Sequence, residues 1–147
     1  MKERHKIIPS SYLVLMKDGK VLLLRRYNTG YEDGNYGLPA GHGEKDESFT
    51  DTVIREIKEE IGINLKPGDC KVAHIMHRYC GENNERVDAF FTAEKYGGEI
   101  KNMEPNKCDD LSWYDLNNLP KNIIPYIRQA LECINKKIFY SEFGWQK

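Results

Sequence analysis

The sequence lacks the features that characterise membrane proteins and broad nucleic-acid binders. Its 147 residues contain no run of about 18 apolar residues, the length that a membrane-spanning helix requires. Lysine and arginine number 22 against 23 aspartates and glutamates, so the net charge is −1. This balance supplies no extended basic surface, and we expect neither a membrane nor a polymeric nucleic acid as a partner.

The cysteines of the sequence also lack the spacing that is typical of metal-binding or redox-active cysteines. Its four cysteines, Cys70, Cys80, Cys108 and Cys133, form no C-x-x-C pair, which favours reduced thiols. The charged N-terminus is followed by only a short apolar run that Pro9 interrupts, unlike a secretory leader. We therefore expect a soluble cytoplasmic protein. No repeat, low-complexity tract or linker divides it, which predicts a single domain over residues 1–147.

Apolar runs and turn residues predict a mixture of strands and helices. Residues 11–26 hold two apolar runs joined by Asp18-Gly19, a pattern typical of a tight hairpin. Six glycines or prolines between residues 27 and 46 predict a long loop that can approach a ligand closely. Further strands are predicted over 71–80, 86–96 and 111–116, with a turn at 81–84, and a helix is predicted after Pro125 within 122–139.

A helix near residues 49–61 has signals at both ends. Ser48 and Asp51 have the spacing of a capping box, and Gly62 suits the left-handed position after the last turn. An apolar stripe predicts the face that packs on a sheet: Phe49, Val53, Ile54, Ile57 and Ile61. Glu60 lies at the border of this stripe, which predicts partial burial.

Glu56, Glu59 and Glu60 are spaced i, i+3 and i+4, so that a helix crowds their charges on one side. Such repulsion costs stability unless something offsets it. Glutamates at this spacing often form only a solvated helix face. A bound divalent cation is the simplest functional explanation, because hard cations prefer clustered carboxylate oxygens.

The residues around these glutamates resemble a known family motif. Each specified position of the Nudix box, G-x5-E-x7-R-E-U-x-E-E-x-G-U with U aliphatic, is matched here by Gly41, Glu47, Arg55, Glu56, Ile57, Glu59, Glu60, Gly62 and Ile63. The resemblance implies an α/β fold, an α/β/α sandwich around a mixed β-sheet, in which residues 41–63 form a loop, a helix and a loop. It also implies hydrolysis of a nucleoside diphosphate linked to a group X, with Mg²⁺ or Mn²⁺ as cofactor.

The same resemblance assigns roles to individual residues. Glu56, Glu59 and Glu60 would hold the metal together with the backbone carbonyl of Ala40, and Glu104 would join them as a ligand or as the base for the attacking water. Arg55 would pair with Glu47 to orient the helix. Arg26 and His42 would contact the substrate phosphates. Arg26, His42 and Glu104 also have an ordinary interpretation as solvated residues.

The substrate is left open by the sequence. A MutT-type hydrolase of nucleoside triphosphates, including oxidised or noncanonical ones, is our first interpretation. Diadenosine polyphosphates, suggested by Tyr79 at 16 residues after Ile63, ADP-ribose and nucleotide sugars are alternatives, as is a nucleotide sensor without turnover. Residues 122–126 are expected to shape the base site. Asp46, where many relatives of the motif have glycine, raises the question of an altered loop. The sequence does not decide whether the chain forms a homodimer.

Overall fold

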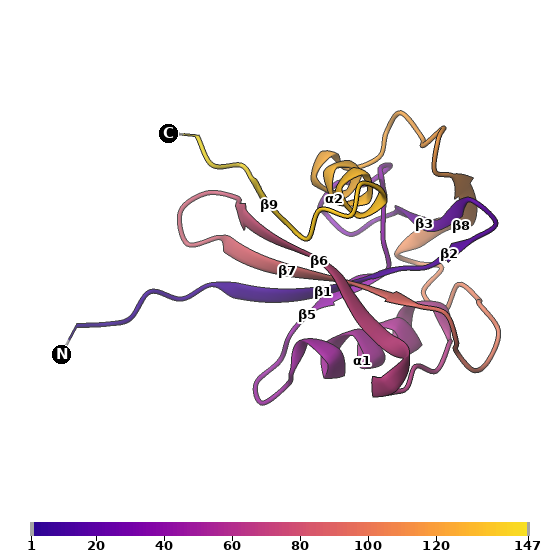
Figure 1. Cartoon of the computed structure of the whole chain (residues 1–147), viewed down its shortest axis with the longest axis horizontal. Helices are drawn as coiled ribbons and strands as arrows, with labels where there is room; N and C mark the ends of the chain where they lie inside the picture. Colours follow the sequence, from indigo (N-terminus) through magenta and orange to yellow (C-terminus); the bar gives the residue numbers. More distant parts are fainter. Residues whose placement is uncertain (1, 147) are drawn as a thin grey trace.

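Two β-sheets and two α-helices build the fold of the computed structural model, which describes residues 2–146 (Figure 1). The elements in chain order are β1 (Ile8–Val14), β2 (Met16–Lys17), β3 (Lys20–Arg26), β4 (Tyr36–Gly37), β5 (Ala40–His42), α1 (Phe49–Ile61), the short 3-10 helix η1 (Pro67–Asp69), β6 (Cys70–Tyr79), β7 (Glu85–Ala93), β8 (Cys108–Asp115), α2 (Pro125–Asn135) and β9 (Tyr140–Phe143). No helix within residues 2–146 is long and apolar enough to cross a bilayer.

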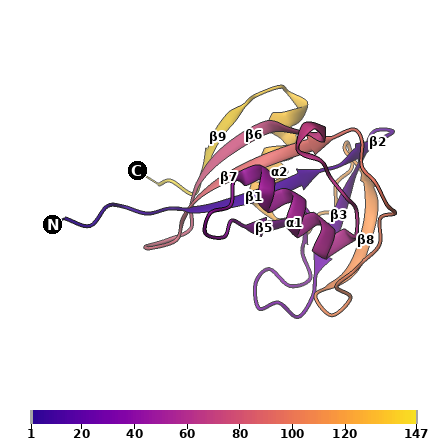
Figure 2. The same ribbon diagram turned by 90° about the horizontal axis from the view of Figure 1, so that it is seen from below.

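The larger sheet is mixed and lies between the two helices. Its strand order is β5-β1-β7-β6-β9, with parallel pairs β1–β7 and β6–β9 and antiparallel pairs elsewhere. Helix α1 covers one face and α2 the other, as Figures 1 and 2 show from two sides. In the second sheet, β3 pairs with β2, β4 and β8. The predicted α/β/α arrangement around a mixed sheet is confirmed, and the second sheet is an addition to it.

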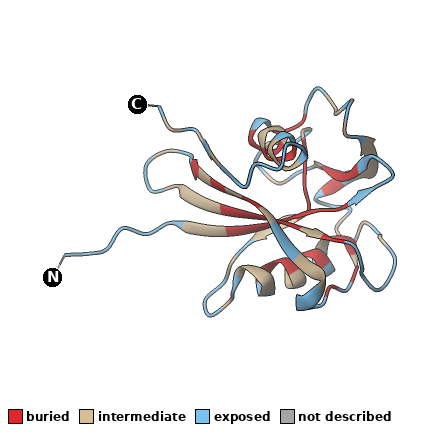
Figure 3. Ribbon diagram, in the orientation of Figure 1, coloured by how far each residue is buried: buried red, intermediate tan, exposed pale blue. Residues whose placement is uncertain are grey.

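Successive side chains along the last part of β1, and at the residue that follows it, point alternately into two separate hydrophobic cores. Tyr12 and Val14 join the core on the α2 side, while Leu13 and Leu15 join the core under α1. All four residues are buried, as expected for a central strand covered on both faces. Figure 3 shows this burial along the middle of the sheet and on the inner sides of both helices.

Helix α1 begins and ends where the sequence predicts. The Ser48 hydroxyl accepts a hydrogen bond from the backbone N–H of Asp51, and the Asp51 carboxylate accepts one from the N–H of Ser48. Gly62 follows the last turn with φ of 77°, which is the left-handed conformation that glycine adopts without strain. Val53, Ile57 and Ile61 are buried under the sheet, and this packing fixes which side of the helix faces the solvent.

Other local predictions are confirmed with changed boundaries. Asp18 and Gly19 both have positive φ between β2 and β3, as a tight hairpin turn requires. The predicted strand over 111–116 begins earlier, at Cys108, and the C-terminal helix ends at Asn135. The sequence reasoning missed β9, because its four residues gain their hydrogen bonds only from β6.

Candidate active site

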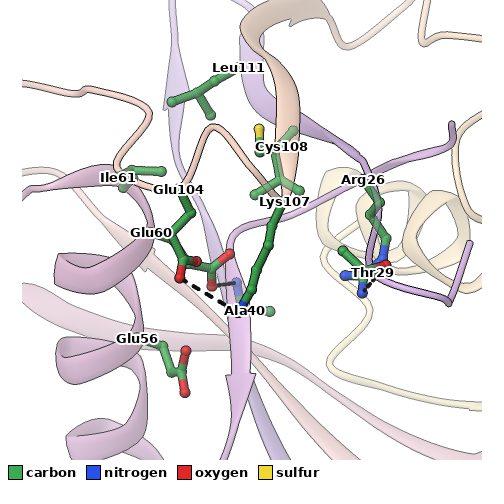
Figure 4. A pocket seen from close by; sticks show the side chains of 11 residues that line it. Arg26, Thr29, Ala40, Glu56, Glu60, Ile61, Glu104, Lys107, Cys108 and Leu111 are labelled. Carbon is green, nitrogen blue, oxygen red and sulfur yellow. Dashed lines mark hydrogen bonds and ion pairs between the residues drawn. The ribbon is translucent and has the colours of Figure 1, made fainter. Parts of the chain in front are cut away.

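Helix α1 and the loop before β8 place three carboxylates around one cavity of about 170 Å³. Glu56 and Glu60 are one helical turn apart and therefore project from the same side of α1. Glu104 comes from the opposite wall, and Figure 4 shows its side chain pointing toward that of Glu60 beside Ala40. The predicted association of Glu104 with two box glutamates is thus a feature of the structure, while its chemical role stays a prediction.

Glu60 is the carboxylate whose ionisation the cavity disturbs most. Burial raises its pKa to about 8, and the nearby charges of Glu56 and Glu104 add to that effect. The backbone N–H of Ala40 donates to Glu60 Oε1 at 2.9 Å, which partly opposes the shift. Burial also raises the pKa of Glu56, and Arg55 Nη1 donates to Glu56 Oε1 at 2.7 Å. Clustering these carboxylates without a cation is therefore unfavourable.

Arg55 holds the loop before α1 against the helix. Its Nε donates to Glu47 Oε2 at 2.6 Å, and its Nη2 donates to Glu47 Oε1 at 3.0 Å and to the His42 carbonyl at 3.1 Å. The hydrogen bonds from Arg55, aided by the N–H of Glu44, lower the pKa of Glu47 to about 2. The predicted pairing of Arg55 with Glu47 is confirmed, and it orients the same guanidinium that contacts Glu56.

Asp46 does not change the course of this loop. It has φ of 63°, the left-handed conformation for which glycine would serve best. Aspartate tolerates this region better than most residues, because its short polar side chain can hydrogen-bond locally. The loop still presents Glu47 to Arg55, so the departure at Asp46 is accommodated by the backbone.

Gly41 lies close against the side chain of Glu56 on α1. A Cβ atom at this position would lie 2.1 Å from Cδ of Glu56, far inside van der Waals contact. Only glycine leaves Glu56 in its observed position, because the Glu56 side chain occupies the space that a Cβ at position 41 would need. The first glycine of the box therefore positions a carboxylate.

Glu59 lies apart from the cavity. Its side chain is 55% exposed, and Arg55 Nη1 is 3.8 Å from its Oε2. Val53, Ile57 and Ile61 form the buried side of α1, and Glu60 borders that side and faces the cavity, while Glu59 lies on the solvent side of the helix. Sequence spacing alone placed Glu59 with Glu56 and Glu60, and its predicted role as a metal ligand stays a prediction.

Lys107 is a cation in this cavity that the sequence reasoning missed. A turn joins it to Glu104, with the N–H of Lys107 donating to the Glu104 carbonyl at 2.8 Å. Its Nζ lies 3.9 Å from Glu104 Oε2, and Figure 4 shows the side chain extending toward Ala40. The i, i+3 spacing of Glu104 and Lys107 was the available signal.

The donor set suits a hard divalent cation, because three carboxylates line one half-buried space. Within residues 2–146, however, no group of three or more histidine, cysteine, aspartate or glutamate side chains is arranged closely enough to hold one metal ion. Each carboxylate instead has a protein partner: Arg55 for Glu56, the Ala40 N–H for Glu60 and Lys107 for Glu104. Ala40 lines the same space, and the predicted metal-binding role of its carbonyl and of the glutamates stays a prediction.

A second cavity, of about 600 Å³, adjoins the first, and Arg26 and Ala40 line both. Arg26 Nε donates to the Tyr31 carbonyl at 2.7 Å, and its Nη2 donates to Thr29 Oγ1 at 3.2 Å. Arg25 points away, to Asp109, as strand alternation predicts. Arg26 thus stands at the junction of the two cavities, and its predicted contact with a substrate phosphate stays a prediction.

The second cavity has an apolar wall and a polar floor. Leu38, Ile124, Tyr126 and Ile127 form the wall, so two residues of the segment 122–126 line this cavity, while the role of the segment in base binding stays a prediction. The floor is formed by side chains from four strands of the larger sheet: Ser10, His42, Arg78 and Arg86. The sequence reasoning found only His42. The missed signal was a pair of arginines alternating with apolar residues in β6 and β7.

Two aromatic residues singled out from the sequence lie outside both cavities. Tyr79 packs on Trp145, with ring centroids 5.0 Å apart, at the end of β6. Trp113 packs against the core under α1. Neither contributes to the lining, so the spacing of Tyr79 from Ile63 has a structural explanation.

Comparison with known proteins agrees with this arrangement. The family model for the NUDIX domain matches residues 8–132. An ADP-ribose pyrophosphatase from Methanocaldococcus jannaschii is 35% identical over 112 residues, covering 74% of this chain and 62% of that protein. An NAD-capped RNA hydrolase, NudC, from Pseudomonas putida is 31% identical over 113 residues, covering 77% of this chain and 38% of that protein. The chain thus spans less than two thirds of either relative.

Solved structures show the same fold along most of the chain. A MutT NUDIX hydrolase from Burkholderia pseudomallei superposes with a TM-score of 0.78 at 28% identity, covering 87% of this chain and 98% of that one. A MutT protein from Methanosarcina mazei Go1 gives a TM-score of 0.76 at 26% identity, covering 92% and 98%.

Proposed function

The chain belongs to the Nudix hydrolase family, and on that premise we propose that it hydrolyses the diphosphate bond of a nucleoside diphosphate linked to a group X. One observation carries the proposal: three carboxylates face a small cavity that opens, past Arg26, into a larger one. The small cavity suits a diphosphate with its cations, and the larger one suits a nucleoside or sugar. Water attacks one phosphorus atom of the P–O–P link and the bond from that atom to the bridging oxygen breaks. Each of the two products then carries one of the two phosphoryl groups.

Glu56, Glu60 and Glu104 would hold Mg²⁺ or Mn²⁺, with the Ala40 carbonyl beside them and Glu59 approaching from solvent. A bound divalent cation neutralises diphosphate oxygens and lowers the pKa of water. The raised pKa of Glu60, to about 8, supports this assignment, because a carboxylate so disfavoured as an anion gains most from a cation.

The remaining residues would contact the substrate or the attacking water, or would hold the loop before α1 in position. Glu104, on a loop facing α1, would accept the proton of the attacking water or complete the ligand set. Arg26 and Lys107, which line the same cavity as the carboxylates, would supply positive charge to the phosphates. Arg55 and Glu47 hold the loop that positions Glu56. His42 would contact a phosphate from the floor of the larger cavity.

As the specific reaction we propose cleavage of a nucleoside triphosphate, oxidised or noncanonical ones included, to the monophosphate and pyrophosphate. The likeness to two MutT structures over at least 87% of the chain supports it. The 35% identity to an ADP-ribose pyrophosphatase favours ADP-ribose or a nucleotide sugar as the second candidate. A sensor without turnover would have no need of the full carboxylate set.

A substrate panel tests both levels of the proposal. The protein is incubated with Mg²⁺ and, separately, nucleoside triphosphates, ADP-ribose, nucleotide sugars and diadenosine polyphosphates, and the products are separated by ion-exchange chromatography. We expect turnover that EDTA abolishes and that Glu60→Gln lowers by about 100-fold or more. Turnover of no member, or turnover unaffected by EDTA and by Glu60→Gln, would contradict the proposal.

A further inference from the structure

We propose that the floor of the larger cavity binds an oxyanion, a phosphate or carboxylate carried by the sugar that adjoins the substrate diphosphate. The inference rests on the proposed function, because the diphosphate must lie among the carboxylates for its sugar to enter the larger cavity. Among nucleoside diphosphates linked to a group X, it predicts a preference for those whose sugar carries a further negative group.

The first observation is a pair of arginines facing each other across two strands. Arg78 of β6 and Arg86 of β7 are direct partners in the antiparallel register, and both line the cavity. Like charges in this position destabilise a sheet. Asp88 is the carboxylate beside them, and it accepts from Arg78 Nε at 2.7 Å. One positive charge is therefore left without an anion.

Arg78 is fully engaged by the protein. Besides Asp88, its guanidinium donates to Tyr12 Oη at 3.1 Å and to Cys80 Sγ at 3.2 Å, and it lies 3.7 Å from the ring centroid of Tyr126. Only 4% of its side chain is exposed, and Asp88 is fully buried. The buried Asp88 thus neutralises Arg78 from beneath the floor and leaves the charge of Arg86 for a ligand.

Arg86 keeps donors free. Its Nε donates to Asn84 Oδ1 at 3.0 Å and its Nη1 donates to His42 Nε2 at 2.6 Å. No hydrogen bond within residues 2–146 uses its Nη2. Because arginine can only donate, His42 Nε2 must accept, which leaves the His42 proton on Nδ1 as a further donor. Glu85, the neighbouring acidic residue, instead bonds His5 and His77.

Ser10 supplies an independent observation. Within residues 2–146, its Oγ is the one buried side-chain polar atom that has no hydrogen-bond partner. Ser10 lies opposite His42 in the β1–β5 register and opposite Asp88 in the β1–β7 register, so it belongs to the same floor. A buried hydroxyl without a partner is costly, and a bound acceptor would remove that cost.

The charge of the whole lining agrees with an anion. Three arginines line the larger cavity, and no aspartate or glutamate among the described residues does so. The smaller cavity differs, because three glutamates line it together with Arg26 and Lys107. Since Arg26 stands at their junction, the unit that follows the diphosphate reaches the floor, while the apolar wall covers its less polar face.

Calorimetric binding of matched product analogues in Mg²⁺ tests the inference without turnover. One set is 5′-AMP against adenosine 2′,5′- and 3′,5′-bisphosphate, and the other is glucose 1-phosphate against glucuronic acid 1-phosphate. The sets separate a phosphate from a carboxylate as the recognised group. We expect the doubly anionic member of at least one set to bind about tenfold tighter or more. Arg86→Gln should remove most of this advantage, and Arg86→Lys should keep part of it.

Ser10→Ala and Arg4→Gln complete the experiment. Ser10→Ala should reduce the advantage of the doubly anionic ligand while leaving the melting temperature equal or higher, since it removes an unpartnered hydroxyl. Arg4 is exposed and lines neither cavity, so Arg4→Gln should leave the advantage unchanged. Equal binding within both sets, or an advantage that survives Arg86→Gln, would overturn the inference. Either result alongside turnover in the substrate panel would leave the proposed function intact.

Discussion

Gly41→Ala should disable the active site while leaving the fold nearly intact. The added methyl group would lie 2.1 Å from Cδ and 2.2 Å from Cγ of Glu56. Carbon atoms in contact are about 3.5 Å apart or more, so the Glu56 side chain must retreat by about 1.4 Å. It can do so, because it is a flexible side chain and the backbone conformation of Gly41 admits alanine.

The retreat has a defined consequence. Glu56 would give up the 2.7 Å hydrogen bond from Arg55 Nη1 and its place among the carboxylates. A misplacement of about 1 Å in an active site can lower the rate about 100-fold. We therefore expect kcat to fall by about 10²-fold and the free energy of unfolding by no more than about 1–2 kcal/mol. Steady-state kinetics on the best substrate of the panel and urea unfolding measure the two effects.

Gly68→Ala is the matched control. Nothing lies within 4 Å of a Cβ at Gly68, and its φ also lies outside the left-handed region, so the same methyl group should change neither kcat nor stability appreciably. A Gly41→Ala enzyme with kcat within about threefold of the wild type would refute the reasoning. It would show that the position of Glu56 is unimportant, or that the loop yields in place of the side chain.

Three further predictions concern other parts of the molecule. Glu104→Gln should lower kcat by about 10²–10⁴ with a much smaller change in KM, and kcat within about twofold of the wild type would make Glu104 a solvated loop residue. The pKa of Glu47 is lowered to about 2, so its contribution to stability is present above pH 4.5 and lost as the pH falls toward 2. Urea unfolding should show Glu47→Gln less stable than the wild type at pH 7, with a gap that narrows on acidification; a constant gap would contradict the ion pair. At Gly144, with φ of 85°, a Cβ would lie 2.2 Å from the backbone oxygen of Tyr79, so Gly144→Ala should release the C-terminal segment, and unchanged Trp145 fluorescence would show that it stays docked.

Local rules in the sequence determined the box helix and the hairpin. The Ser48–Asp51 capping box, the glycine at position 62 and the apolar stripe act within one or two turns of chain, so each could be recognised from neighbouring residues. The turn at Asp18-Gly19 is equally local. The family motif then added the pairing of Arg55 with Glu47, which the structure contains.

Tertiary packing alone decided which glutamates share a cavity. Glu59 and Glu60 are neighbours in an acidic run, and only the burial of Ile57 and Ile61 against the sheet turns one to solvent and the other inward. The second cavity was beyond local rules for the same reason. Ser10, Arg78 and Arg86 come from strands whose pairing depends on the whole sheet. The free energy that brings these residues together is spread over many contacts between residues distant in sequence. The pattern of a short segment therefore cannot predict it.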